Sequence, residues 1–232
     1  MSEFSTIPTR LAEVRARIAR AASRADRDPA SVRLVAISKT FPSDAVRAAA
    51  DAGQTEFGEN KVQDALQKMD QTAGLPIRWH LVGHLQSNKA KKAGARFDVV
   101  QSVDGAALIP LLDDAATNAG RRLEALVQVD LAGEVTKFGA REDELPGIFA
   151  AAAAARALTI VGLMAIPPAV EDADAARPYF RALRGVRDRL LAGGVSPSML
   201  TELSMGMSHD FEIAIEEGAT MVRVGTAIFG AR

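Results

Sequence analysis

Eight short apolar segments alternate with amphipathic ones along this chain, and this alternation constrains the fold more than any other feature. The apolar segments are rich in Val, Ile and Leu, as expected of strands that are covered on both faces. Strict alternation of strands and helices favours a parallel sheet with helical crossovers. The predicted strands are 34–39, 55–59, 79–83, 99–103, 125–129, 160–165, 202–205 and 221–225.

The segments between the predicted strands have the spacing of amphipathic helices. Eight strands within 232 residues favour a closed (β/α)8 TIM barrel over an open doubly wound sheet, because such barrels have about 250 residues. A further amphipathic helix is predicted at 9–25, ahead of the first strand. We find no linker or repeat, so we predict an α/β fold with one domain over 1–232. The helices between the strands are predicted at 43–52, 60–69, 87–93, 105–119, 142–157, 172–192 and 209–217.

The chain has a net charge of −1 and contains no cysteine. So small a charge provides no field that would attract nucleic acid or an anionic membrane. The lack of thiols excludes disulfides and cysteine-ligated metals, and the spacing of the three histidines gives no support for a metal site. No apolar run reaches the roughly 18 residues of a membrane span, and the N-terminus lacks the pattern of a signal peptide. We therefore expect a cytoplasmic protein that binds neither nucleic acid nor membrane.

A lysine ends the first predicted strand. In a (β/α)8 barrel the functional site lies where the strands end, and the wholly apolar run before Lys39 places its amine at that mouth. A partly desolvated lysine is a competent nucleophile for a Schiff base with an aldehyde. The alternative is a lysine that merely extends its charged end into solvent, and position alone does not decide between the two.

The loops after the last two predicted strands carry the features of a phosphate site, and such barrels commonly bind phosphate there. Two glycines would let backbone amides approach an anion, three residues supply hydroxyl groups, and the next helix would direct its positive end toward the same point. Each feature alone is more simply explained as a tight turn with a helix cap. Together with Lys39 they indicate a cofactor that carries both a phosphate and an aldehyde. The residues are Ser204, Gly206, Ser208, Gly225 and Thr226.

An arginine interrupts the last apolar run. Arg223 would be costly to bury without a partner. A cation that faces the ring nitrogen of pyridoxal 5′-phosphate (PLP) disfavours protonation of that nitrogen, which weakens the ring as an electron sink. The alternative is an ion pair with a glutamate of the barrel, such as Glu59 or Glu202.

Six segments together resemble the pyridoxal phosphate homeostasis protein family, which is similar to the N-terminal barrel of alanine racemase. The resemblance spans nearly the whole chain, from residue 35 to residue 230, and its motifs are long and occur in the same order. The segments are AISKT at 36–40, FGEN at 57–60, WHLVGHLQSNK at 79–89, GLMAIP at 162–167, LSMGMS at 203–208 and VRVGT at 222–226.

The resemblance implies a PLP-binding barrel of fold type III and assigns roles to matching positions. Lys39 matches the lysine that holds PLP as a Schiff base, and Arg223 matches the arginine that meets the pyridine nitrogen. Asn60 matches an asparagine in the cofactor pocket. Ser204, Gly225 and Thr226 match the phosphate cup, to which we add Met205 and Ser208 from the same loop.

Two positions depart from the pattern of the family. The fourth predicted strand has Gln101 where members often have histidine, and the fifth has Asp130 where asparagine is common. We expect both to alter the mouth of the pocket, while neither affects the lysine, the arginine or the phosphate cup.

The resemblance implies intracellular PLP homeostasis by a carrier or buffer that passes PLP to apo-enzymes, with no catalytic residue of its own. The alternative is a PLP-dependent amino-acid racemase. In that family the second base is a tyrosine from an added C-terminal domain of a dimer, whereas this chain ends at Arg232 and has one tyrosine, Tyr179, inside a predicted helix. We therefore expect a monomeric carrier, although His84 could in principle replace the tyrosine. A non-PLP aldolase that uses Lys39 is disfavoured, because it needs no cation at a ring nitrogen.

Overall fold

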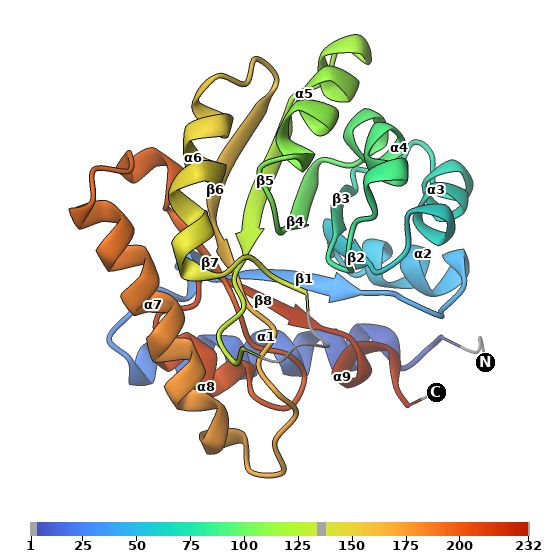
Figure 1. The fold of residues 1–232 in the computed structure, drawn as a ribbon. Helices are drawn as coiled ribbons and strands as arrows, with labels where there is room; N and C mark the ends of the chain where they lie inside the picture. The colour runs from blue at the N-terminus through green and yellow to red at the C-terminus, as the bar shows by residue number, and fades with distance from the viewer. Residues whose placement is uncertain (1–3, 134–137, 232) are drawn as a thin grey trace.

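In the computed structural model, the structure describes residues 4–133 and 138–231. Within them, eight parallel strands pair in sequence order, and the last strand pairs with the first, so that the sheet closes into a barrel (Figure 1). The prediction of a (β/α)8 barrel is therefore confirmed. The strands are β1 (Arg33–Ile37), β2 (Glu56–Glu59), β3 (Arg78–Leu81), β4 (Val99–Val103), β5 (Leu123–Gln128), β6 (Leu158–Met164), β7 (Glu202–Ser204) and β8 (Met221–Val224).

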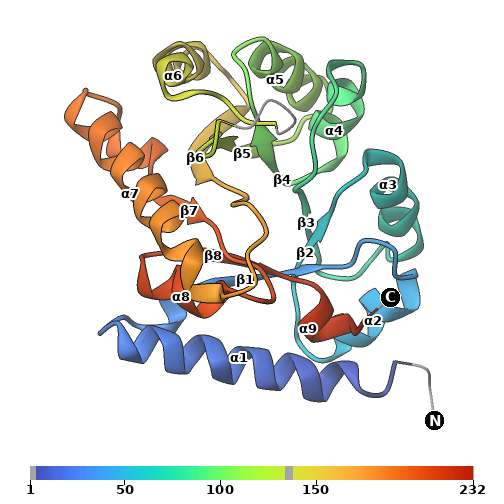
Figure 2. The same ribbon diagram turned by 60° about the horizontal axis from the view of Figure 1, so that its bottom comes forward.

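Helices surround the barrel on its outside (Figure 2). The α-helices are α1 (Ile7–Arg24), α2 (Ser43–Asp51), α3 (Val62–Gln71), α4 (Ala90–Arg96), α5 (Leu108–Asn118), α6 (Leu145–Ala153), α7 (Arg177–Ala192), α8 (Phe211–Glu216) and α9 (Thr226–Phe229). Short 3-10 turns are η1 (Pro29–Ser31), η2 (Ser87–Lys89), η3 (Glu142–Glu144), η4 (Ala173–Ala176) and η5 (Pro197–Met199). None of the helices in the described ranges is long and apolar enough to cross a membrane.

Several strands end one or two residues earlier than predicted, because the chain turns away as it reaches the mouth of the barrel. β1 ends at Ile37, and Thr40 adopts a left-handed φ of 71° just beyond it. β8 ends at Val224. Lys39 and Gly225 therefore lie in loops above the strands, where side chains and amides can face a ligand.

Six of the helices between the strands, α3 to α8, start two to five residues later than predicted. In two of them a 3-10 turn comes first and a proline follows in the first turn of the α-helix. The predicted helices at 142 and 172 open with the 3-10 turns η3 and η4, and the α-helical part follows with Pro146 or Pro178 in its first turn. Proline is tolerated there because the first amides of a helix have no partner within it. The short helix α9 was not predicted, since four residues are too few to show a helical period.

Helix α1 lies along the outside of the barrel against α8, α9 and α2 (Figure 2). Its apolar face is buried, and its arginine face is tied to α8 by Arg17, 2.8 Å from Glu212, and Arg24, 3.0 Å from Glu216. Partly exposed pairs of this kind contribute little stability each. Burial of the apolar face is the larger contribution to docking. The buried residues are Ile7, Leu11, Val14, Ile18, Ala21 and Ala22.

The interior of the barrel is divided between apolar and polar side chains. Alternate residues of each strand point inward, and two small apolar clusters form apart from the main core. The first consists of Val35, Ile37, Val82 and Met221, and the second of Val99, Leu126 and Met164. Buried polar side chains lie beside them and are described below.

Candidate functional site

A cavity of about 570 Å³ opens at the end of the barrel where the strands finish, which we call the upper end. Its volume is that of a typical small-molecule site, and its position is that of the active sites of such barrels. The lining residues are Ile37, Lys39, Phe41, Asn60, Val82, Gly83, His84, Gln128, Phe138, Ile166, Met207, Ser208, His209, Arg223, Gly225 and Thr226.

Six of the eight residues predicted to bind the cofactor line this one cavity: Lys39, Asn60, Ser208, Arg223, Gly225 and Thr226. The other two do not. Ser204 is fully buried and lies behind Arg223, and Met205 is fully buried in the hydrophobic core. Ser204 is the last residue of β7, and Met205 follows it. The role of all eight in cofactor binding stays a prediction.

The backbone just before Lys39 is held by a buried trio of side chains. The Ser38 hydroxyl donates to Glu59 over 2.6 Å, and the Lys68 ammonium donates to Glu59 over 2.5 Å and to the Ser38 carbonyl over 2.7 Å. Hydrogen bonds to charged groups are the stronger kind, so this trio fixes the end of β1. Lys39 therefore extends into the cavity from a rigid base.

Arg223 enters the cavity wall from β8 and is 4% exposed. Its guanidinium donates to the Ser204 hydroxyl over 2.7 Å and to the Ala165 carbonyl over 2.8 Å. Burial lowers its pKa to about 10, and the charge of Asp210 opposes that shift. The side chain therefore remains a cation at neutral pH, with its closest acceptors neutral.

The alternative of an ion pair between Arg223 and a barrel glutamate is wrong. Glu59 lies on the outer face of β2 under α3, where its carboxylate accepts a hydrogen bond from Lys68. Glu202 lies 2.9 Å from Arg33 at the end of the barrel where the strands begin, which we call the lower end. Both carboxylates are thus tied to other cations.

The loops after β7 and β8 bring two backbone amides to one point. The amides of Gly225 and Ala227 lie 3.1 and 3.4 Å from the Ser208 hydroxyl oxygen, which accepts from both. Converging amides of this kind form a concave site for an anionic oxygen. The hydroxyl group of Thr226 borders the same cavity. The arrangement suits a phosphate group, because the position of the Ser208 oxygen shows where the two amides can donate to an acceptor.

Gly206 does not line the cavity, and packing within the protein already requires a glycine at this position. Its φ is 92°, and an added Cβ would lie 2.9 Å from the backbone of Phe211 and 2.6 Å from Ala214. The glycine is therefore needed for a left-handed turn packed against α8. Helix α8 starts at Phe211 instead of near Ser208 and has six residues, so the short helix α9 supplies the amides at the cavity.

The mouth of the cavity carries an aromatic stack that was not predicted. The rings of His84 and Phe138 lie parallel with centroids 3.6 Å apart, and His84 is 3.1 Å from Asp104. Burial raises the pKa of Asp104, and its contacts with His84 oppose that shift. The Gln128 amide donates to the Phe138 carbonyl over 2.7 Å. Gln128 ends a strand, so the strand-end rule could have found it, whereas Phe138 lies in a loop without a motif.

The two departures from the family pattern do not lie where we expected them. Gln101 is fully buried in the middle of β4 and points into the barrel, so it is not at the mouth. Asp130 accepts from the amides of Ala132 and Gly133 in the loop after β5 and does not line the cavity. The expectation that these two residues shape the mouth is therefore wrong for Gln101, and Asp130 organises a turn.

The chain matches the family described as alanine racemase, N-terminal domain, over residues 9–232. A pyridoxal phosphate homeostasis protein of Pseudomonas aeruginosa is 43% identical over 229 residues, which cover 99% of this chain and 97% of that protein. The protein of the same name from Escherichia coli is 40% identical over 236 residues and is covered to 98%, with 99% of this chain.

Among solved structures, PipY of Synechococcus elongatus with PLP bound is 40% identical, with a TM-score of 0.85 over 97% of this chain and 100% of that chain. The alanine racemase of Corynebacterium glutamicum shares the fold alone, at 18% identity and a TM-score of 0.61 over 94% of this chain and 60% of that chain. The resemblance found in the sequence is confirmed, and the chain belongs to the alanine racemase N-terminal domain family, among the pyridoxal phosphate homeostasis proteins.

Proposed function

We propose that this chain binds PLP in the upper cavity, with Lys39 as the covalent anchor, and that it carries or buffers the cofactor instead of catalysing with it. The observation that supports this most strongly is the meeting of three groups around one cavity. An amine from the β1 loop, a buried cation from β8 and the converging amides of the β8 loop suit the aldehyde, the ring nitrogen and the phosphate of one molecule.

Lys39 contributes the nucleophile. Its backbone follows the rigid trio of Ser38, Glu59 and Lys68, so little conformational freedom is lost when the amine meets an aldehyde. The apolar side chains of Ile37 and Val82 line the same cavity as Lys39. The neutral amine is the form in which lysine acts as a nucleophile, and an apolar environment favours that form.

Arg223 sets the electronic character of the site. Bound PLP supplies an electron sink for amino-acid chemistry, and a cation facing its ring nitrogen weakens that sink. Arg223 suits this role because it is a buried cation whose pKa of about 10 keeps it charged, and because its two contacts are neutral acceptors. The site therefore favours retention of the cofactor over stabilisation of a carbanion.

The racemase alternative requires a second base across the cavity. Tyr179, the one tyrosine of the sequence, lies on α7 and is not among the residues that line the cavity. His84, held by Asp104, is the residue at the mouth that could take its place. The names of the relatives, which describe PLP homeostasis, favour a carrier, and we propose that it acts as a cytoplasmic monomer that passes PLP to apo-enzymes.

Absorbance spectroscopy tests the anchor. We expect the purified protein to develop a yellow absorbance band on incubation with PLP and to retain it through dialysis. Lys39→Ala should abolish the retained band, whereas Lys61→Ala, which removes an exposed lysine at the start of α3, should leave it unchanged. A parent protein that stays colourless would refute the proposed function.

A turnover assay tests the carrier role. The PLP-loaded protein is incubated with a panel of L-amino acids, and the chirality, keto-acid and amine products are followed. We expect no multiple turnover, and size-exclusion chromatography of the same sample should give the mass of a monomer. Turnover near the roughly 10 s⁻¹ typical of enzymes would favour the racemase, and its loss in His84→Ala would identify the second base.

A further inference from the structure

A row of polar side chains crosses the interior of the barrel from Arg223 at the upper end to Glu56 at the lower end. Arg223 lies 2.7 Å from the Ser204 hydroxyl, which lies 2.6 Å from the Oε1 atom of Gln101. The Nε2 atom of Gln101 lies 2.9 Å from Nδ1 of His80, and Nε2 of His80 lies 3.0 Å from Oε2 of Glu56. Five strands contribute one member each: β8, β7, β4, β3 and β2.

This row is unusual for the inside of such a barrel, where branched apolar side chains normally fill the space. Ser204, Gln101 and His80 are each fully buried. Buried polar groups destabilise the fold unless they are hydrogen-bonded. Gln101 makes a third contact, in which its amide nitrogen lies 2.9 Å from the sulfur of Met221. The row is therefore a satisfied network up to His80, and its members depend on one another.

The hydrogen bonds of the row run in one direction. A guanidinium only donates, so the Ser204 hydroxyl accepts a hydrogen bond from Arg223 and donates one to Gln101. The amide nitrogen of Gln101 then faces Nδ1 of His80, which must accept. His80 is therefore neutral with its proton on Nε2, and burial lowers its pKa in agreement with that state. Hydrogen bonds aligned in this way polarise one another.

The last contact of the row is electrostatic. Nε2 of His80 and Oε2 of Glu56 are close, but neither forms a hydrogen bond with good alignment. Burial raises the pKa of Glu56, and its contacts with His80 and the charges of Arg33 and Arg78 outweigh that effect and lower it. Glu56 is therefore an anion at neutral pH and forms the negative end of a row whose positive end is Arg223.

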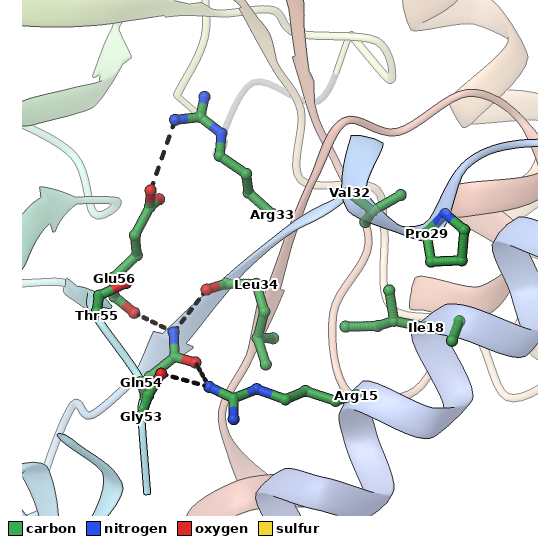
Figure 3. Close-up of a pocket in the computed structure, with 11 residues that line it drawn as sticks. Arg15, Ile18, Pro29, Val32, Arg33, Leu34, Gly53, Gln54, Thr55 and Glu56 are labelled. Carbon is green, nitrogen blue, oxygen red and sulfur yellow. Dashed lines mark hydrogen bonds and ion pairs between the residues drawn. The ribbon is translucent and has the colours of Figure 1, made fainter. Parts of the chain in front are cut away.

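At the lower end, Glu56 borders a second cavity of about 310 Å³ between α1, β1 and the start of β2 (Figure 3). The polar groups of this cavity form hydrogen bonds with one another. Arg15 donates to the carbonyls of Ala52 and Gly53 and to the side chain of Gln54. The amide nitrogen of Gln54 donates in turn to the carbonyls of Leu34 and Glu56. This cavity is thus a structural junction. At this cavity Glu56 lies 3.7 Å from Arg33, and Glu56 is the last residue of the row.

We propose that Ser204, Gln101 and His80 are positioning residues that couple the guanidinium of Arg223 to the carboxylate of Glu56. The inference rests on the proposed binding of PLP. No carboxylate in the described part of the chain lies within ion-pair distance of Arg223. The charge of Asp210 supports the cation from a greater distance. The orientation of the guanidinium at the cofactor ring is therefore set by its neutral acceptors, and a change at the opposite end of the barrel alters that orientation through the row.

The test measures PLP affinity, the position of the absorbance band of bound PLP, and urea unfolding of the unbound protein in one set of variants. Gln101→Leu removes both links of the middle residue at similar volume. Gln101→His keeps one acceptor for Ser204 and one donor for His80 on a single ring. Glu56→Gln removes the terminal charge. Glu124→Gln is the matched control, since Glu124 lies at the same end of the barrel, 2.6 Å from Arg78, and outside the row.

We expect Gln101→Leu to weaken PLP binding about tenfold and to shift the band, because coupling within one buried network has this size. Glu56→Gln should weaken binding about threefold with a smaller shift, since it acts through the whole row. Gln101→His and Glu124→Gln should have nearly the PLP affinity and the band position of the parent protein. If Gln101→Leu does not fold, Glu56→Gln against Glu124→Gln decides the question.

Two failures can be told apart. A parent protein that binds no PLP would refute the proposed function and this inference with it. A parent protein that binds PLP, together with Gln101→Leu and Glu56→Gln variants that lose stability but keep its affinity and spectrum, would refute the inference alone. The row would then be a structural filling of the barrel.

Discussion

The two ends of the barrel differ in how the protein compensates its charges. At the lower end, Arg33 lies 2.9 Å from Glu202, and Arg78 lies 2.6 Å from Glu124. At the upper end, the more deeply buried Arg223 contacts a hydroxyl and a carbonyl, and no described carboxylate is within ion-pair distance. The most deeply buried of these three arginines is thus the one without a direct counter-charge.

This difference separates the parts of the barrel that hold the fold from the part that serves a ligand. Paired charges at the lower end are satisfied within the protein, as expected where residues contribute stability. A buried cation in a cavity wall that has only neutral hydrogen-bond partners remains able to attract an electron-rich group of a ligand. Variants at the upper end should therefore change binding more than stability, and variants at the lower end, outside the row that ends at Glu56, should do the reverse.

The largest effect is expected at Gly225. An added Cβ would lie 3.2 Å from the Ile37 carbonyl, and the larger valine would also push the Gly225 amide away from its acceptor. Overpacking and the loss of amide contacts to a charged group together amount to about 3 kcal/mol. Gly225→Val should therefore weaken PLP binding about 100-fold in a spectroscopic titration.

Gly105 provides the control for that variant. It lies in the loop after β4, and an added Cβ there would have no heavy atom within 4 Å. Gly105→Val should bind PLP as the parent protein does. Equal affinity of the Gly225→Val variant would mean that the phosphate is bound elsewhere, and the contrast between the two ends would lose its main support.

The next effect is expected at the lower end, at Asp113 of α5. Its carboxylate accepts from the amides of Arg156, Ala157 and Leu158, where the chain enters β6, over 2.9, 2.7 and 2.9 Å. Asp113→Ala would leave these groups without their acceptor, which costs about 3 kcal/mol of unfolding free energy. Urea unfolding should show this loss, while PLP affinity stays within about twofold; a variant as stable as the parent protein would contradict the assignment.

The same carboxylate predicts a pH dependence of stability. Burial raises the pKa of Asp113, and the three amides and Arg156 outweigh that effect and lower it below the usual value. A lowered folded-state pKa stabilises the fold above the unfolded pKa of about 3.9, and this contribution disappears as the pH falls through the folded-state pKa. Urea midpoints of the parent protein and of Asp113→Asn should therefore converge below about pH 4, and parallel curves would exclude this linkage.

The sequence contains most of the information about the fold because alternation of apolar and amphipathic segments is a local signal. It predicts all eight strands, and six of them end one or two residues earlier than predicted where the chain turns at the mouth. The site is predicted where a residue has a strong chemical reason, as for Lys39 and Arg223. Both lie at the cavity because strand order brings β1 and β8 together.

The remainder of the site depends on which way a side chain faces, and no local pattern reports that. Ser204 and Met205, which we predict to bind the cofactor, have fully buried side chains that do not line the cavity. Gln101 was assigned to the mouth, although its position in mid-strand places it inside the barrel. Phe138 reaches the mouth by tertiary packing against His84, from a loop with no motif of its own.

A smaller effect than those at Gly225 and Asp113 is expected at Thr226. This variant sharpens the comparison because its effect should appear in binding alone. The residue begins α9 at the cavity and is exposed, so its hydroxyl contributes little to the unbound fold. Thr226→Ala should change the unfolding free energy by less than about 0.5 kcal/mol. It should weaken PLP binding by about 1–3 kcal/mol, the size of a hydrogen bond to a charged group. Thr226→Ser keeps the hydroxyl and should restore affinity, whereas equal weakening by both substitutions would show that the methyl group, and not the hydroxyl, contacts the ligand.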